Sequence, residues 1–397
     1  MAHFSRADTS VLGRWWWTVD RWTLVAIAAL IGFGYVMMLA ASPAVAERIN
    51  QSRDMFLLKQ VGFLLLAGLT VVGVSLLSPR GVRRIALLGF AGALVLTAAT
   101  LAVGSEIKGA RRWIALPGMA LQPSEFLKPC FAVVTAWLLT GGGTAQGPAH
   151  GHAPRGDAAG GASPLPGTLA AFVLYGLIAL LLKSQPDIGM LAVVTAVFFA
   201  QLFVGGLNLV FVGVGAGGLV AAALGAYAFF PHVRSRVTRV LDPSAGDNYQ
   251  VTTALEAFGN GGLLGRGPGE GRVKDALPDA HADFVFAVMG EEFGLVVCVL
   301  VLGLFAFIVL RGLLRLLAES DPFIVLACAG LVTSFGLQAF VNMASSLHLI
   351  PTKGMTLPFV SYGGSSVLAI AFGMGMLLAL TRRRSRLDDG WGWEAGR

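Results

Sequence analysis

The feature that most constrains this chain is a series of apolar runs, each about as long as a bilayer is thick. A transmembrane helix needs about 20 predominantly apolar residues. Charged residues make up only 13% of the chain, about half the share found in soluble domains, which excludes a cytosolic enzyme, a disordered chain and a DNA-binding domain. The runs show no strict alternation, so helices are favoured over a β-barrel. They occupy residues 22–42, 56–77, 84–104, 124–140, 168–183, 188–206, 207–230, 284–310, 322–348 and 363–381.

These runs predict an all-α polytopic integral membrane protein with about ten transmembrane helices. Span boundaries are least defined where three short runs follow one another, within 168–230. An even number of spans places both termini on the side of the basic loops 78–84 and 311–315, which the positive-inside rule assigns to the cytoplasm. The predicted organisation is a cytoplasmic N-terminal tail, a single transmembrane domain and a cytoplasmic C-terminal tail. Their bounds are 1–21, 22–381 and 382–397, and a large outer loop, 231–283, connects spans seven and eight.

The outer connection 105–123 is unexpectedly basic. Lys108, Arg111 and Arg112 stand against Glu106, which runs against the positive-inside bias. One interpretation is that the arginine stems lie along the lipid and reach the headgroups. The alternative is an anion site at the outer face, for a group such as phosphate.

The next segment, 122–128, reads Gln-Pro-Ser-Glu-Phe-Leu-Lys. Pro123 and Ser124 suit a helix start, and Ser with a nearby Glu resembles capping chemistry. Glu125 and Lys128 are three residues apart and share a helix face. Ionisable groups inside a membrane are usually functional, although a structural pair is the alternative. Further along, Asp187 is a natural N-cap that we expect to lie near this pair.

Acidic side chains gather again where the large outer loop meets the eighth span. Asp283 directly precedes the apolar run, so it is either an N-cap or a catalytic carboxylate beside His281. Glu291 and Glu292 lie about two turns deeper, and at least one should face the interior. Upstream, residues 249–258 are expected to form a short interfacial helix, and the glycine cluster after them to form turns.

The segment 349–366 contains two prolines and three glycines, so it cannot form a regular helix. We expect a re-entrant or surface loop packed against protein, with Lys353 as another outer cation. The cysteines Cys130, Cys298 and Cys328 lie inside apolar runs, where thiols act as small hydrophobes. Their odd number and position argue against disulfides and a metal site.

Several of these strings together resemble the SEDS family, named for shape, elongation, division and sporulation. The resemblance extends in order along nearly the whole chain, and its 351–366 string is highly specific. The Pro-Thr-Lys-Gly opening of that string is more similar to the cell-division members than to the elongation members. The strings occupy 108–114, 122–128, 185–187, 280–294 and 351–366.

The resemblance implies peptidoglycan glycosyltransferase activity on lipid II, a disaccharide-pentapeptide carried by undecaprenyl pyrophosphate. The family's essential acidic residue falls on Asp283, which would deprotonate the acceptor hydroxyl as general base. Cations near the outer face would stabilise the leaving pyrophosphate. A divalent cation, Mg or Mn, would share that charge with Asp283 as a candidate ligand, but no metal-ligand spacing demonstrates one. The substrate-binding candidates are Lys108, Arg112, Gln122, Ser124, Glu125, Lys128, Asp187, His281, Lys353 and Ser361.

Three functional hypotheses follow. The first is a lipid II polymerase of septal cell-wall synthesis in the bacterial cytoplasmic membrane. The second is a lipid II flippase, which would use a polar path including Lys59, Glu291 and Glu292. The third is a scaffold for other division proteins. The family implies a class B penicillin-binding protein with transpeptidase activity and other divisome membrane proteins as partners, and no nucleic acid.

Overall fold

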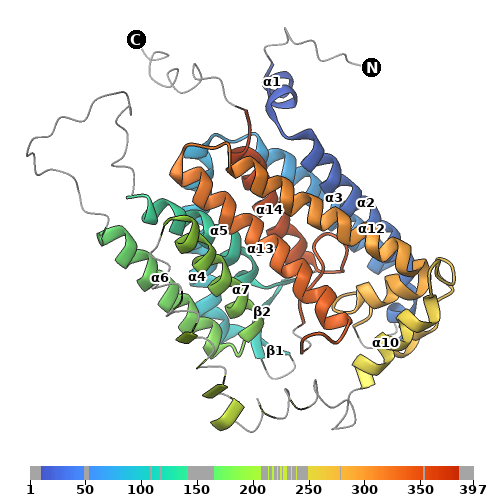
Figure 1. Cartoon of the computed structure of the whole chain (residues 1–397). Helices are drawn as coiled ribbons and strands as arrows, with labels where there is room; N and C mark the ends of the chain where they lie inside the picture. Colours follow the sequence, from blue (N-terminus) through green and yellow to red (C-terminus); the bar gives the residue numbers. More distant parts are fainter. Residues whose placement is uncertain are drawn as a thin grey trace, which may run out of the picture.

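A bundle of long helices forms the body of the molecule (Figure 1). The computed structural model describes residues 10–48, 53–107, 110–116, 119–141, 165–206, 249–277, 279–351 and 354–383, with scattered residues between 213 and 238. Helix α1 and the C-terminal end of α14 meet at one end of the bundle, where the Arg383 N–H donates to the Thr18 carbonyl. We call this the inner end. The outer end carries the strands and α10 (Tyr249–Gly261) (Figure 1).

The long helices coincide with the predicted apolar runs. Six of them are long and apolar enough to cross a membrane, and α7 and α14 are shorter apolar helices. The predicted run 207–230 lies largely outside the described residues. The bundle helices are α2 (Arg21–Arg48), α3 (Arg53–Ser75), α4 (Pro79–Val103), α5 (Pro123–Leu139), α6 (Leu165–Ser184), α7 (Ile188–Val204), α12 (Val285–Leu316), α13 (Pro322–Ser346) and α14 (Gly364–Leu380).

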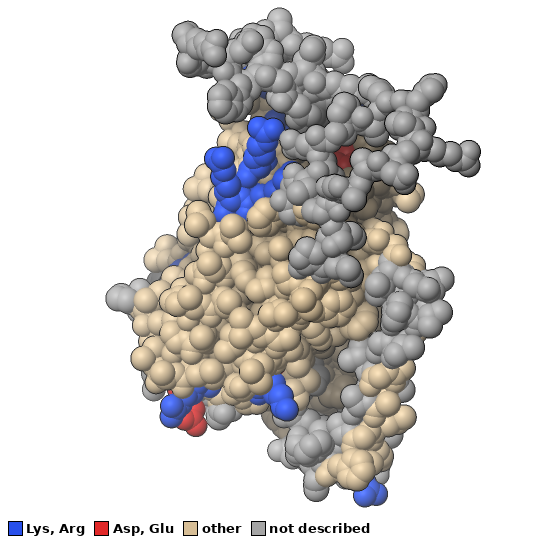
Figure 2. Space-filling model, turned by 90° about the vertical axis from the view of Figure 1, so that its left-hand side faces the viewer, with Lys and Arg blue, Asp and Glu red and all other residues tan. Residues whose placement is uncertain are grey.

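The side view shows how this bundle suits a bilayer. A broad band of uncharged side chains separates basic groups at the inner end from basic and acidic groups at the outer end (Figure 2). Many of the exposed side chains on the bundle helices are large and apolar, such as Leu65, Leu88 and Leu300. Such a surface is stable only against lipid or protein. The structure therefore agrees with the predicted polytopic membrane protein.

The helical fold class is confirmed for the bundle, and the outer end adds a small sheet that the sequence did not predict. Residues there form an antiparallel sheet in the order β1-β2-β3, with strands at Ser105–Ile107, Ala110–Leu116 and Met119–Leu121. The connection lies outside the apolar runs, so its backbone groups need not be satisfied within one helix, and short strands can pair with each other. The sheet leads directly into α5 and so positions its first turn.

The predicted N-terminal tail also contains structure. Helix α1 (Val11–Thr18) begins at Ser10, whose hydroxyl accepts the Gly13 N–H. Trp15 is buried and its Nε1 donates to the Ser75 Oγ at 2.8 Å. Trp15 and Trp16 thus give this helix an apolar face that packs on the inner end.

An ion-pair cluster joins the start of α2 to α12 at the inner end. Asp20 is 2% exposed and lies 2.7 Å from Arg311 Nε and 2.8 Å from Arg315 Nε. Burial acts to raise the pKa of Asp20, but hydrogen bonds from Arg311 and Thr23 and the two guanidinium charges lower it overall. The carboxylate is therefore ionised and fixes the inner end of α12.

The segment after α13 enters the bundle as predicted for 349–366. Leu357, Phe359 and Val360 are fully buried, although the backbone here is not helical. Phe359 meets α2 at Gly34, where any Cβ would collide with the Phe359 carbonyl oxygen. Gly34 lies 14 residues before the end of α2 at Arg48, which is about 21 Å of helix. We call this stretch, 354–363, the re-entrant segment.

A candidate active site at the outer end

Asp283 lies on a turn just before α12. The helix begins at Val285 and its N-cap is Phe284, so the N-cap interpretation of Asp283 is wrong. The Asp283 N–H donates to the Asp279 carbonyl at 3.1 Å, and its own carbonyl accepts the Asn342 side-chain amide at 3.0 Å. The side chain is partly exposed. These two bonds fix the backbone from which the Asp283 carboxylate projects.

Gly354 lies against the Asp283 carboxylate. A Cβ built on this glycine would be 3.4 Å from Asp283 Oδ2, and the glycine has φ +63°. Both the left-handed backbone and the close approach favour glycine at this position. The re-entrant segment therefore borders the candidate base directly.

Two hydrogen bonds join this turn directly to the re-entrant segment, and Asn342 on α13 links the two through one bond to each. Asn342 bridges them, because its amide also donates to the Met355 carbonyl at 2.6 Å. Ser361 Oγ donates to the Ala282 carbonyl at 2.6 Å, and the Tyr362 N–H donates to the His281 carbonyl at 2.8 Å. The structure thus places the predicted Ser361 beside Asp283. Sequence reasoning missed Asn342, although a polar amide within the predicted span 322–348 was a usable signal.

His281 packs against Tyr362, with 5.2 Å between the ring centroids. Burial lowers the pKa of His281 below its ordinary value, and the charge of Asp279 only partly opposes this. The imidazole is therefore neutral at pH 7. Burial also raises the pKa of the Tyr362 hydroxyl, so neither ring brings a charge to the site.

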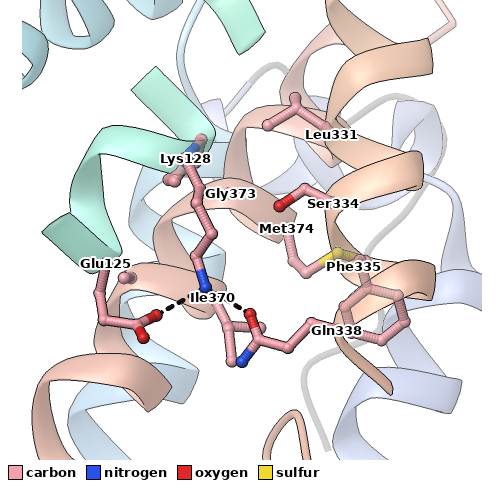
Figure 3. A pocket seen from close by; sticks show the side chains of 11 residues that line it. Glu125, Lys128, Leu331, Ser334, Phe335, Gln338, Ile370, Gly373 and Met374 are labelled. Carbon is pink, nitrogen blue, oxygen red and sulfur yellow. Dashed lines mark hydrogen bonds and ion pairs between the residues drawn. The ribbon is translucent and has the colours of Figure 1, made fainter. Parts of the chain in front are cut away.

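The predicted Glu125–Lys128 ion pair forms at the start of α5. Lys128 Nζ lies 2.7 Å from Glu125 Oε2 and donates to Gln338 Oε1 at 2.5 Å. Lys128 is only 4% exposed. Figure 3 shows the amine between the acid and the amide, beside a small cavity of about 20 Å³, enough for about one water.

Gln338 connects this pair to the re-entrant segment. Its amide nitrogen donates to the Thr356 carbonyl at 3.1 Å, and Ser366 Oγ donates to Glu125 Oε2 at 3.3 Å. The Thr356 and Ser366 hydroxyls are 2.7 Å apart. The pair therefore supports the segment that carries Gly354. Sequence reasoning also missed Gln338, which is another polar amide on α13, one turn before Asn342.

A second cluster lies between β2, α5 and α7. Arg112 Nη1 is 3.4 Å from Asp187 Oδ2, and the guanidinium also donates to the carbonyls of Gln185 and Pro186. Asp187 Oδ1 accepts the Met190 N–H at 3.1 Å, which confirms the predicted N-cap. Burial raises the pKa of Asp187, and the charge of Arg112 opposes that rise.

The start of α5 lies beside this cluster. Gln122 Nε2 is 3.4 Å from Asp187 Oδ2 and 3.2 Å from Ser124 Oγ. The helix begins at Pro123, as predicted, but its N-cap is Gln122, which makes no capping side-chain bond. The capping role predicted for Ser124 is therefore wrong, because Ser124 already belongs to the helix.

Lys108 and Lys353 lie outside the described residues. Among the residues that are described, no group of three His, Cys, Asp or Glu side chains is arranged to hold a metal ion. The described part of the site therefore supplies Asp283 as a single candidate ligand rather than a formed metal centre.

Glu291 and Glu292 do not line an open path. Their exposed fractions are 0% and 1%. Glu291 accepts the Val273 N–H at 3.0 Å, and Glu292 Oε1 lies 2.6 Å from Lys274 Nζ. Both face the interior, as predicted, but they bind the large outer loop. The flippase hypothesis therefore loses the contribution of these two acids to its predicted polar path.

Comparisons with known proteins agree with one another. The family model described as cell cycle protein, which covers FtsW, RodA and SpoVE, matches residues 21–386. A Caulobacter vibrioides protein named "Probable peptidoglycan glycosyltransferase FtsW" is 42% identical over 96% of this chain and 94% of its own. A protein of the same name from Alkalilimnicola ehrlichii is 36% identical over 94% of this chain and 92% of its own length.

Solved structures show the same fold. A chain from a peptidoglycan synthase complex, described for its coordination of polymerization and crosslinking, gives a TM-score of 0.72 at 28% identity, over 91% of this chain and 97% of that one. The rod shape determining protein RodA of Thermus thermophilus gives 0.65 at 27% identity, over 92% and 97%.

Proposed function

The chain belongs to the cell cycle protein family of FtsW, RodA and SpoVE, and from this premise we propose that it is a peptidoglycan glycosyltransferase of the cell-division type. It polymerises lipid II into glycan strands at the outer face of the cytoplasmic membrane, during septal wall synthesis. The observation that carries the proposal is the position of Asp283. This carboxylate projects from a hydrogen-bonded turn at the outer end, beside the segment that carries the family's most specific string.

We assign Asp283 as the general base. Its carbonyl accepts from Asn342 and that of its neighbour Ala282 accepts from Ser361, so the turn that carries the carboxylate is held where an acceptor sugar would approach. In the transferase step the acceptor oxygen loses its proton to Asp283 and bonds to the donor anomeric carbon. The bond from that carbon to the lipid pyrophosphate breaks. Proton transfer to a positioned base contributes about 10²–10⁴ in rate.

The cations divide into two groups in this proposal. Arg112 and Lys128 are held by Asp187 and Glu125, so their assigned role is to order the walls of the site. Their charges still lower the potential energy of an anion nearby. Lys108 and Lys353, which lie within the family strings 108–114 and 351–366, are assigned to the leaving pyrophosphate. A divalent cation bound at Asp283 would share the same charge when present.

The proposed partner is a class B penicillin-binding protein with transpeptidase activity, together with other divisome membrane proteins. The similarity to a chain of a peptidoglycan synthase complex supports it. The scaffold hypothesis predicts that loss of Asp283 leaves function intact. It gives no role to the hydrogen bonds by which Asn342 and Ser361 hold the turn that carries this carboxylate.

The experiment is polymerisation of labelled lipid II by the purified chain, with and without its transpeptidase partner. Long glycan strands support the proposal. If no strands form although the partner complex is assembled and its transpeptidase works, the transferase proposal fails. A lipid II translocation assay on the same preparation then tests the flippase alternative.

A further inference from the structure

Helix α12 is broken at Gly294, where φ is +77° and ψ is −179°. The turn after α10 (Tyr249–Gly261) fills this break with its own backbone. The N–H groups of Leu295 and Val296 donate to the carbonyls of Gly262 and Leu263, at 2.9 and 3.2 Å. The backbone groups that a continuous helix would pair internally are thus paired across the two segments.

The other side of the break is satisfied in the same way. The carbonyls of Glu291 and Glu292 accept the N–H groups of Arg266 and Gly267, at 2.9 and 3.0 Å. A Cβ at Gly294 would collide with the turn. This close backbone approach explains the glycine and makes the turn a fixed part of the membrane bundle.

The depth of the break follows from the length of α12. Arg311 marks its inner boundary, since it is charged and bound to Asp20. A hydrocarbon core about 30 Å thick takes about 20 residues at about 1.5 Å each, which puts the outer boundary near Glu291. Leu295 and Val296 then lie about 6–8 Å inside the hydrocarbon.

The turn that binds these residues carries two leucines. Leu263 is 67% exposed and Leu264 is 81% exposed. Leu295 and Val296 beside them are 52% and 48% exposed. The four side chains continue the apolar outer surface of α12, which is the surface that lipid covers in a membrane protein. Two leucines that are exposed at this depth contact the acyl chains of the lipid.

We propose that the turn 262–265 is inserted into the outer leaflet and that Leu263 and Leu264 anchor the large outer loop to the acyl chains. Arg266, whose side chain is 37% exposed, then reaches the level of the lipid phosphates. The anchor ties the loop that leads to Asp283 to a fixed height above the hydrocarbon. This inference concerns the lipid bilayer and stands whether or not glycosyl transfer is confirmed.

The test places an environment-sensitive fluorophore on Leu264→Cys in the full chain, reconstituted in phosphatidylcholine–phosphatidylglycerol nanodiscs. The native cysteines Cys130, Cys298 and Cys328 are buried, so the unsubstituted chain serves as the labelling blank. Glu270→Cys is the matched control, because Glu270 is exposed on the same loop but follows the turn. Leu263→Cys repeats the measurement at the neighbouring position.

We expect the label at 264 to lose most of its emission to lipids carrying a nitroxide on the acyl chain and little to iodide in the water. The label at 270 should show the reverse. Equal iodide quenching at 264 and 270 would overturn the proposal, because the turn would then lie in water. Protection of both leucine positions from both quenchers would also overturn it, since protein rather than lipid would cover the turn.

Discussion

The buried pair of Lys274 and Glu292 gives the most quantitative prediction. Lys274 Nζ contacts Glu292 Oε1 at 2.6 Å and the carbonyls of Gly269 and Ala40 at 2.8 and 2.9 Å. The side chains are 7% and 0% exposed. Lys274→Met removes the amine and leaves a buried carboxylate with the Gly269 N–H at 2.9 Å as its remaining donor in the described contacts. Breaking such a pair costs about 3–5 kcal/mol.

The measurement is the Tm of the purified chain in detergent. An unfolding entropy of about 2.1 cal/mol/K per residue, over 397 residues, converts that cost into a loss of about 4–6 °C. Adding Glu292→Gln to Lys274→Met removes the uncompensated charge, so the double variant should regain part of the loss. The reasoning is refuted if Lys274→Met melts with the wild type, or if the double variant melts lower than the single one.

Three further predictions follow from the site. Arg112→Ala leaves Asp187 buried without its ion-pair partner and should lower the free energy of unfolding by about 2–3 kcal/mol. The control Arg111→Ala removes an exposed pair worth at most about 1 kcal/mol. Equal Tm values for the two variants would contradict this. The pKa of His281 lies below its ordinary value of 6.5, so protonation favours the unfolded state and stability should fall as pH drops from about 7.5 to about 5.5. The variant His281→Gln should lose this pH dependence of Tm. If the variant keeps the dependence, other groups cause it. Gly354→Val forces a β-branched side chain into φ +63° beside Asp283 and should reduce kcat about tenfold or more; normal kcat would show that this contact does not position the carboxylate.

The spans could be predicted because lipid imposes a length and a composition on every helix that crosses it. The sheet could not, since β1 and β3 are only three residues long and each pairs with β2 over too few residues to show a period of two in the sequence. The break at Gly294 was also invisible, because glycine is frequent in membrane helices. It became a break only through the backbone of residues 262–267, which are about 30 positions earlier in the chain.

The candidate site was partly predictable. The i, i+3 spacing of Glu125 and Lys128 gave their ion pair, and the position of Asp187 before an apolar run gave its capping bond. The partners of these residues come from distant elements. Gln338 and Asn342 stand out as polar amides within a predicted span, but their partners, like that of Lys274, cannot be identified from local sequence. Only the packing of α13 and the outer loop brings these side chains to the acids and carbonyls they bind.

The role of Asp283 is the central claim, and Asp283→Asn tests it most directly. The asparagine keeps the size and backbone contacts of the residue but is a far weaker base. Lipid II polymerisation is measured for wild type, Asp283→Asn and the control Glu256→Gln, which alters an exposed acid on α10. Each variant is first shown to fold and to bind the transpeptidase. We predict that Asp283→Asn lowers the rate by about 10²–10⁴, while Glu256→Gln polymerises normally. Equal polymerisation by Asp283→Asn and wild type would contradict the account.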